Sequence, residues 1–416
     1  MDPTTYTIGE TLRLTLALES PRFGLAPEDL FSLAVRDNPK RAFLFVSRVL
    51  GKHLSRPPAV LLAAGRLLAL AWTGSEDGEE VRWWTDVLTE RTTPLFSQVL
   101  DRRQTGRIDL PPSERTLFLG FAETATGLAR GVADCFGGEA GYLSTTRLHQ
   151  PGDFLTFEEV HSHASTHRLY LTPDDPFVKG CTRVVLIDDE LTTGNTALSL
   201  VRLLHRQFGI PRFTLLSLLD NSDGKNRQAL ERELGIEIQA VSLLRGRLVS
   251  VQAEPPPPPN LEDWRERAGQ PLFPGDPPLS LPDGRTLLNT RDRDGILAQC
   301  RGAANRLGEG GETLFLGTGE RIYEPALLAG LCGAAAFHST TQSPVCALAG
   351  SAITSGVRFT PSDCYSAAGY LYNVPRNQYR RAVICTEQST RDPRGLAQLA
   401  GYLSSRGIDA VEEVLL

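Results

Sequence analysis

Two adjacent carboxylates, Asp188 and Asp189, directly follow four apolar residues, Val184–Ile187. The apolar run predicts a buried strand, and ligands bind at the carboxyl ends of strands in open α/β sheets. Neighbouring carboxylates are costly to bury unless they meet a cation or hydroxyl groups, and a ribose together with Mg²⁺ supplies both. We therefore take Asp188 and Asp189 as candidate catalytic residues and as the candidate metal ligands.

A turn of small, mostly hydroxylated residues comes next and opens a predicted helix over 196–208. Free N–H groups at a helix N-terminus, together with threonine hydroxyls, form a cradle for a phosphate dianion. An ordinary strand, Asx turn and threonine N-cap is the alternative interpretation. The candidate phosphate-binding residues are Thr192, Thr193, Gly194, Asn195 and Thr196.

This ordered string resembles the phosphoribosyl-pyrophosphate signature of type I phosphoribosyltransferases. The resemblance implies Mg²⁺ as cofactor and 5-phosphoribosyl-1-pyrophosphate (PRPP) as donor substrate. It also implies that Asp188 and Asp189 bind the ribose 2′- and 3′-hydroxyls, while residues 192–196 hold the 5′-phosphate.

The same resemblance assigns a role to two upstream segments. Phe121, Ala122, Glu123 and Thr124 follow a predicted strand and occupy the place of the pyrophosphate-binding loop, although a plain strand-to-helix turn is the alternative. Arg147 is placed like the basic residue that holds pyrophosphate in relatives, and a guanidinium suits forked phosphate contacts.

A ribbon of two alternating arms is predicted over 153–171, where this class of enzymes has a mobile loop. His161, His163 and Arg168 lie in it, with His167 beside them, and their charge could aid departure of pyrophosphate. A metal site with His161 and His163 on one face of a strand, or solvated histidines, are the alternatives.

Strands alternate with helices from about residue 113, which predicts an α/β fold with a parallel sheet flanked by helices. Before it, the apolar density of 41–50 and 60–72 predicts buried helices. Five consecutive prolines, 255–259, favour an extended spacer. We expect a phosphoribosyltransferase domain over 1–252, a proline-rich linker over 253–282 and a smaller α/β domain over 283–416.

Short words of the first domain recur in the second with similar spacing. TLFLG occurs at 116–120 and 313–317, STT at 144–146 and 339–341, and the strand and loop 184–193 has a counterpart in 382–390. The second domain is then a degenerate copy of the first. The alternative is that any two α/β domains share such apolar words. The acidic pair is lost in the second copy, so we expect this domain to recognise an acceptor or partner, or to give structural support.

Further features narrow the resemblance to the phosphoribosyltransferases of tellurium-resistance and stress operons, whose C-terminal domain is named for a Thr-Arg-Ser-Pro (TRSP) motif. They are Leu44–Ser47, Gly51–His53, Glu123–Gly127 and Thr341–Pro344, which here reads Thr-Gln-Ser-Pro. The resemblance implies synthesis of a nucleoside-like metabolite alongside ATP-grasp and phosphatase enzymes. It leaves a homodimer open.

A formal net charge of -6 disfavours binding to nucleic acid or to an anionic membrane. The N-terminus has no basic start and apolar run of the secretory type, so we expect a cytoplasmic protein. The function predicted is a Mg²⁺-dependent phosphoribosyltransferase that uses PRPP and an unidentified acceptor. The alternative from another class is a non-catalytic regulator that senses PRPP or a nucleotide.

Overall fold

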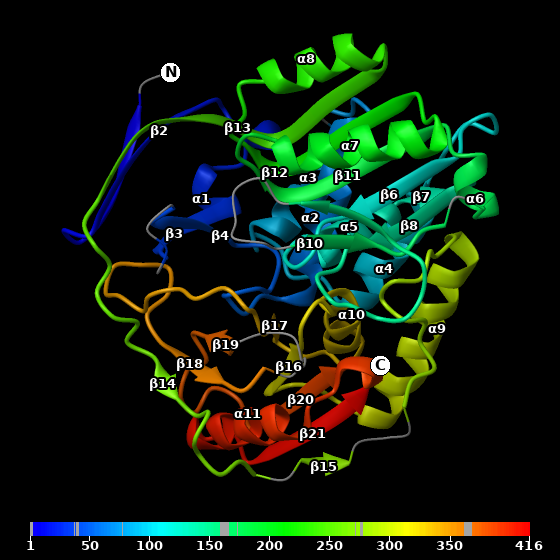
Figure 1. Cartoon of the computed structure of the whole chain (residues 1–416). Helices are drawn as coiled ribbons and strands as arrows, with labels where there is room; N and C mark the ends of the chain where they lie inside the picture. The colour runs from blue at the N-terminus through cyan, green and yellow to red at the C-terminus, as the bar shows by residue number, and fades with distance from the viewer. Residues whose placement is uncertain are drawn as a thin grey trace.

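The computed structural model describes residues 3–36, 38, 41–76, 78–158, 166–172, 174–270, 272–274, 278–361 and 368–416. Two main sheets lie in the upper and lower halves of the molecule in Figure 1. Among the helices of these ranges, none combines the length and the apolar character needed to cross a bilayer.

The first sheet has seven strands, and its central part is parallel. From one edge to the other its order is β1 (Thr4–Ile8), β2 (Leu12–Leu18), β13 (Glu237–Ala253), β12 (Arg212–Asp220), β11 (Arg183–Leu191), β6 (Thr116–Gly120) and β8 (Ala140–Ser144). The five strands from β13 to β8 are parallel, whereas β2 and β1 pair antiparallel. Successive connections leave β6 and β11 in opposite directions, which makes a topological switch point between these two strands.

Helices cover both faces of this sheet because alternate residues of β11 are buried on opposite sides. Val184 and Leu186 pack in one core with α7 (Asn195–Phe208), while Val185 and Ile187 pack in another with α2 (Pro58–Trp72) and α5 (Thr126–Ala133). The predicted parallel α/β sheet, flanked by helices, is therefore confirmed. The other helices before residue 260 are α1 (Pro27–Leu30), α3 (Glu79–Leu88), α4 (Phe96–Thr105), α6 (Pro176–Lys179) and α8 (Lys225–Leu234).

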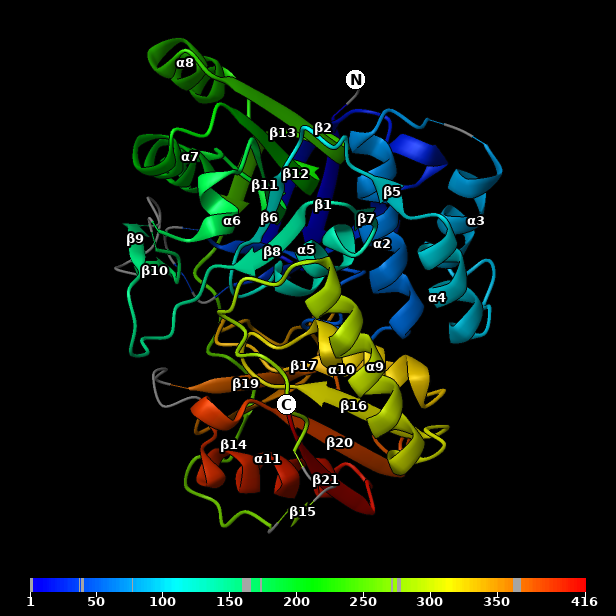
Figure 2. The same cartoon turned by 90° about the vertical axis from the view of Figure 1, so that its right-hand side faces the viewer.

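The second sheet is smaller and wholly parallel. Its order is β15 (Phe273–Pro274), β21 (Ala410–Leu415), β20 (Arg381–Thr386), β16 (Thr313–Gly317) and β17 (Ala336–Ser339). It is accompanied by helices α9 (Thr290–Leu307), α10 (Tyr323–Leu331) and α11 (Pro393–Ser405). Figure 2 shows α9 and α10 on the side of this sheet that faces the first half, with α11 on the other side.

The two sheets share one topology. The order β8-β6-β11-β12 of the first corresponds to β17-β16-β20-β21 of the second. Each half also has an antiparallel hairpin between corresponding strands, β9 (Leu155–Glu158) with β10 (Thr166–Leu169), and β18 (Gly356–Phe359) with β19 (Gly369–Tyr372). The second half therefore repeats the central architecture of the first.

One element predicted before residue 113 is wrong. Residues 41–50 form no helix, because β4 (Phe43–Ser47) pairs antiparallel with β3 (Phe31–Val35). Phe43, Phe45 and Val46 are buried, and such aromatic and β-branched residues favour a strand when a partner strand is available. The second predicted helix, over 60–72, is confirmed as α2.

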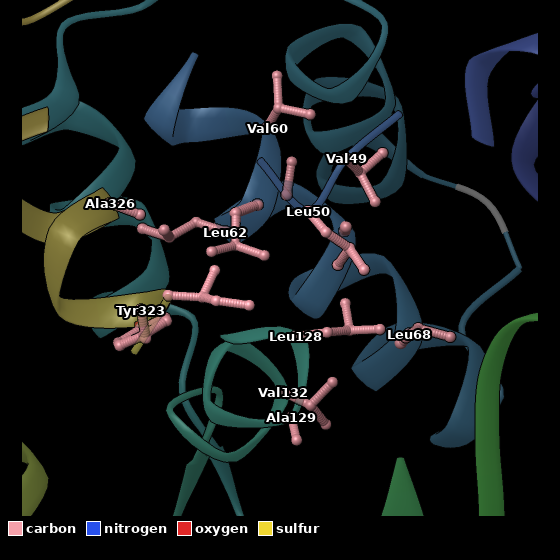
Figure 3. Close-up of a cluster of buried hydrophobic side chains, with 14 of the residues drawn as sticks. Val49, Leu50, Val60, Leu62, Leu68, Leu128, Ala129, Val132, Tyr323 and Ala326 are labelled. Atoms are coloured by element: carbon pink, nitrogen blue, oxygen red, sulfur yellow. The ribbon is translucent and has the colours of Figure 1, made fainter. Parts of the chain in front are cut away.

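The two halves share one hydrophobic core. Figure 3 shows Tyr323 and Ala326 of α10 beside Leu62 of α2, with Leu128 and Val132 of α5 nearby. All five side chains are buried. Burial of this apolar surface is what holds the halves against each other.

A buried charge cluster adds to the contact between the halves. The carboxylate of Asp134, at the end of α5, lies 3.0 Å from Arg130 Nε and 3.2 Å from Nε of Arg293 in α9. Tyr323 donates its hydroxyl to the same carboxylate at 2.7 Å. These positive and donor groups hold the pKa of Asp134 below its usual value despite burial.

The proline run 255–259 forms no helix or strand and is mostly exposed. Beyond it, β14 (Glu262–Asp263) pairs with β18, and β15 pairs with β21. The remaining short elements are β5 (Ile108–Asp109), β7 (Phe136–Gly137) and the 3-10 turns at Arg22–Gly24 and Gln388–Thr390.

Candidate functional site

The acidic pair lies at the carboxyl end of β11, beside the switch point. Asp188 Oδ1 accepts the backbone N–H of Asp189 at 3.0 Å. Both residues line a cavity of about 220 Å³. The structure therefore places the two predicted ligands of the ribose together on the wall of one cavity.

Both carboxyl groups are harder to ionise than usual. Each keeps part of its surface open to the cavity, yet burial raises the pKa of Asp188 well above its usual value, and the like charge of Asp189 adds to the effect. Burial likewise raises the pKa of Asp189 to about 6. A cation or hydroxyl donors nearby would stabilise the ionised form of these two carboxyl groups.

The predicted phosphate loop, residues 192–196, lines the same cavity. Gly194 adopts φ +72° immediately before α7, a left-handed conformation that glycine tolerates without strain. Gly194 has no side chain to cap the helix, and the Asn195 N–H donates to Thr193 Oγ1 at 3.4 Å. The N-terminus of α7 therefore opens onto the cavity with the geometry of an anion site.

The predicted pyrophosphate loop, residues 121–124, also lines the cavity. Ala122 N donates to Thr145 Oγ1 at 2.9 Å. Glu123 is buried and pairs with Lys52, whose Nζ lies 2.5 Å from its Oε1. The loop is thus fixed on one side by the turn after β8 and on the other by the N-terminal segment.

Of the predicted basic residues, Arg147 lines the cavity and Arg168 does not. Arg168 Nη1 instead donates to the backbone oxygen of Arg147 at 2.8 Å. Its place in the structure is therefore that of a support for Arg147. His161 and His163 lie outside the described residues. The neighbouring His167 lines the cavity, and its ring stacks on Phe157 with 5.1 Å between centroids.

Several lining residues lie outside the ribose, phosphate and pyrophosphate motifs predicted from the sequence. They come from the N-terminal segment and from the second half of the chain, and they are Arg36, Arg41, Leu44, Phe45, His53, Thr341 and Ser343. Two of them, Thr341 and Ser343, belong to the Thr-Gln-Ser-Pro segment. Tertiary contacts bring the arginines to the cavity. Arg41, for example, pairs with Glu190 of β11, and its Nη2 lies 2.6 Å from Oε2 of that residue.

His53 is a neutral member of this wall. It is buried, and burial lowers its pKa to about 3, with further lowering by the charge of Lys52. Its ring stacks against Tyr372 of β19 with 5.8 Å between centroids. The second half of the chain therefore orients a residue of the cavity as well as supplying Thr341 and Ser343.

Comparison with known families assigns the chain. A family model described as phosphoribosyl transferase matches residues 30–247, just over half of the chain. This chain belongs to the phosphoribosyl transferase family. A second model, described as the TRSP domain at the C terminus of such a transferase, matches residues 283–402. The predicted resemblance to phosphoribosyltransferases that carry a TRSP domain is thereby confirmed.

Solved phosphoribosyltransferases are similar to parts of the chain. An adenine phosphoribosyl transferase from Trypanosoma brucei, in complex with AMP, pyrophosphate and ribose-5-phosphate, is 18% identical with a TM-score of 0.23. The match covers 36% of this chain and 62% of that one, less than two thirds of its length. The orotate phosphoribosyltransferase of Mycobacterium tuberculosis, in complex with PRPP, is 18% identical over 44% of this chain and 87% of that one, with a TM-score of 0.21. No curated protein matches this chain.

Proposed function

We propose that this protein is a Mg²⁺-dependent phosphoribosyltransferase that uses PRPP as donor. One observation carries the proposal: the acidic pair, the loop 192–196, the loop 121–124 and Arg147 all line one cavity. Each group suits a different part of the donor, namely the ribose, the 5′-phosphate and the pyrophosphate. Membership in the phosphoribosyl transferase family supports the same assignment.

The chemistry needs positioning more than a covalent nucleophile. The bond between C1 of the ribose and a pyrophosphate oxygen breaks, and the lone pair of the acceptor forms the new bond at C1. Positive charge develops on the ribose in the transition state, which the carboxylates of Asp188 and Asp189 stabilise. Arg147 balances the charge that stays on pyrophosphate.

The donor set fits a hard divalent cation. Two adjacent carboxylates with raised pKa lie on the cavity wall, and oxygen ligands are what Mg²⁺ prefers. Asp188 and Asp189 would hold it, directly or through water. When bound, Mg²⁺ would neutralise charge on the pyrophosphate leaving group.

The acceptor would enter against the wall formed by the N-terminal segment and the Thr-Gln-Ser-Pro segment. This wall combines a neutral imidazole, His53, with the hydroxyls of Thr341 and Ser343. The TRSP domain match supports the resemblance to the phosphoribosyltransferases of tellurium-resistance and stress operons. On that resemblance we propose a role in the synthesis of a nucleoside-like metabolite. ATP-grasp and phosphatase enzymes would be its partners in that pathway.

Incubation with a metabolite extract tests the proposed function. The purified chain, PRPP and Mg²⁺ are incubated with cell metabolites, and mass spectrometry follows the phosphoribosyl mass increment together with pyrophosphate release. We expect one acceptor to gain the increment with the wild type and with the control Asp101→Asn, whose side chain is exposed on α4. Donor binding without pyrophosphate release would favour the non-catalytic sensor. Pyrophosphate release without any phosphoribosylated product would instead indicate hydrolysis of the donor.

A further inference from the structure

The two halves contain equivalent backbone hydrogen bonds at the carboxyl ends of their central strands. In the first half, Phe121 N donates to Ile187 O at 3.2 Å and Thr145 N to Gly120 O at 2.9 Å. In the second half the same bonds recur from Thr318 N to Cys385 O at 3.1 Å and from Thr340 N to Gly317 O at 2.9 Å. These matches set the register in which loop 121–124 corresponds to loop 318–321.

The leading segments of the halves are also exchanged. Leu288, which precedes α9, forms a bridge with Tyr142 in edge strand β8 of the first half. Arg56, which precedes α2, forms the corresponding bridge with Phe337 in edge strand β17 of the second half. Each half therefore extends the sheet of the other, as two subunits of a symmetric dimer do.

Within this arrangement, two glutamates occupy equivalent positions and make equivalent contacts. Glu123 Oε2 accepts the backbone N–H of Gln342 at 3.3 Å, and Gln342 follows the STT turn of the second half. Glu320 Oε1 accepts the backbone N–H of Arg147 at 2.9 Å, and Arg147 follows the STT turn of the first half. Each loop thus holds the turn of the opposite half.

Glu320 is placed to hold the backbone of Arg147 in position. Its own backbone is tied to the first half, since Thr126 Oγ1 donates to Glu320 O at 2.8 Å. Arg147 is held at both ends of its backbone, by Glu320 at the nitrogen and by Arg168 at the oxygen. Glu320 is not among the residues that line the donor cavity, whereas Arg147 is.

We infer that Glu320 is a positioning residue for the pyrophosphate contact of Arg147, so that the second half acts as a built-in subunit that completes the donor site. This inference rests on the proposed function. The loop that would bind pyrophosphate in a second active site has taken on the task of aligning Arg147. The second half is therefore needed for donor binding although it lacks the acidic pair.

A purely structural role for Glu320 predicts something different. It would affect the whole cavity equally, because a loosened interface disturbs every loop that lines it. A positioning role acts on the pyrophosphate end alone. The buried side chains of α7 pack with buried residues of the first half, and Asn195 Oδ1 accepts from Asn226 Nδ2 of α8 at 2.8 Å. These two roles are distinguished by comparing the affinities for two ligands that each contain one part of PRPP, inorganic pyrophosphate and ribose 5-phosphate.

The test measures two affinities by calorimetry in Mg²⁺ on the full chain, one for inorganic pyrophosphate and one for ribose 5-phosphate. We expect Glu320→Ala to weaken pyrophosphate binding about tenfold, the size of one lost net hydrogen bond, with ribose 5-phosphate within about twofold of wild type. Glu320→Gln should restore pyrophosphate binding, because the amide oxygen accepts the same N–H. The matched control Glu309→Ala, an exposed glutamate after α9, should match wild type for both probes.

Two outcomes overturn the inference while the proposed function stands. They are unchanged pyrophosphate affinity in Glu320→Ala, and equal weakening for both probes. Should Glu320→Ala fail to fold, Glu320→Asp tests the same split because it shortens the reach by one methylene. Wild-type protein that binds neither probe would instead overturn the proposed function itself, and this inference with it.

Discussion

The carboxyl ends of β11 and β20 occupy equivalent places in the two halves but differ in how their charges are satisfied. Pairing with β6 and β16 aligns Asp188 with Thr386 and Asp189 with Glu387. Glu387 Oε1 accepts from Arg285 Nη2 at 2.8 Å and from Arg321 Nη2 at 3.2 Å. The cavity beside it measures about 30 Å³, against about 220 Å³ beside the aspartates.

The helices that follow show the same contrast. The first turn of α7 has Gly194 at its N-cap, and only a long 3.4 Å hydrogen bond joins Asn195 N to the side chain of Thr193. The first turn of α11 is capped by Asp392, whose carboxylate accepts from Arg394 N at 2.9 Å, and Pro393 removes one donor. In the second site, protein groups already pair with the carboxylate and with the first N–H groups of the helix. In the first site, a ligand would pair with the carboxylates and with the helix N–H groups.

The largest expected effect comes from opening the second site. Glu387→Ala leaves the buried guanidiniums of Arg285 and Arg321 without this carboxylate, so we expect the free energy of unfolding to fall by about 3 kcal/mol. Urea denaturation measures it. Glu312→Ala, at a side chain that is 72% exposed, is the matched control and should change little. A loss under about 1 kcal/mol for Glu387→Ala would contradict the view that ion pairs within the protein stabilise the second site.

Removing a charge at the equivalent position of the first site should raise the free energy of unfolding instead of lowering it. The pKa of Asp189 is raised to about 6, so its stabilising contribution is present below its unfolded value of 3.8 and is lost as pH rises through 6. Asp189→Asn removes this penalty and should stabilise the chain at pH 7 by at most about 3 kcal/mol in the absence of Mg²⁺ and donor. Thermal unfolding with and without ligand measures the sign, and destabilisation of the ligand-free variant would refute it.

Changes at the two helix starts should be smaller. Gly194→Ala forces a Cβ into a left-handed residue and should cost about 1 kcal/mol, although no atom within 4 Å would clash with that Cβ. Asp392→Ala should cost about 1 kcal/mol through loss of the cap. Only Gly194→Ala should also weaken binding of ribose 5-phosphate. Calorimetry tests the split, and equal loss of binding in both variants would contradict it.

The smallest effect is a pH dependence at Glu320. Burial raises its pKa to about 7, partly offset by contacts with Thr146 and Arg147 and by the charge of Arg285, while the charge of Glu123 adds to the rise. Its stabilising contribution is therefore present below its unfolded value of 4.5 and is lost as pH rises through 7. Relative to wild type, Glu320→Gln should gain about 0.7 kcal/mol of stability between pH 6.5 and 7.5.

Denaturation at a series of pH values measures the difference between these two proteins. Asp189 titrates in both proteins, so its effect cancels in that difference. A pH-independent difference would show that Glu320 does not titrate in this range.

The parts predicted well from sequence are contiguous. The strand 183–187, the acidic pair and the helix 196–208 follow from local apolar patterning and helix-start chemistry, and the structure has them as β11 and α7. The helix predicted over 41–50 was wrong because its apolar residues fit both the helical and the strand repeat. Only the pairing with β3 decides between the two.

The remaining site residues depend on tertiary structure. Arg36 and His53 reach the cavity only because the N-terminal segment folds over it, and no local spacing signals this. The Thr-Gln-Ser-Pro segment was visible in the sequence, but its contact with the donor cavity arises from the pairing of the two halves. Closure of the second site by Arg285 was equally hidden, because it lies about a hundred residues from Glu387.

Titration of the full chain with PRPP and Mg²⁺ in a calorimeter tests most directly that only the first half binds the donor. The account predicts one donor per chain, an affinity at least about 100-fold weaker for Asp188→Asn combined with Asp189→Asn, and no loss for Asp101→Asn. Unchanged affinity in the double variant, or two equivalent donors per chain, would contradict it.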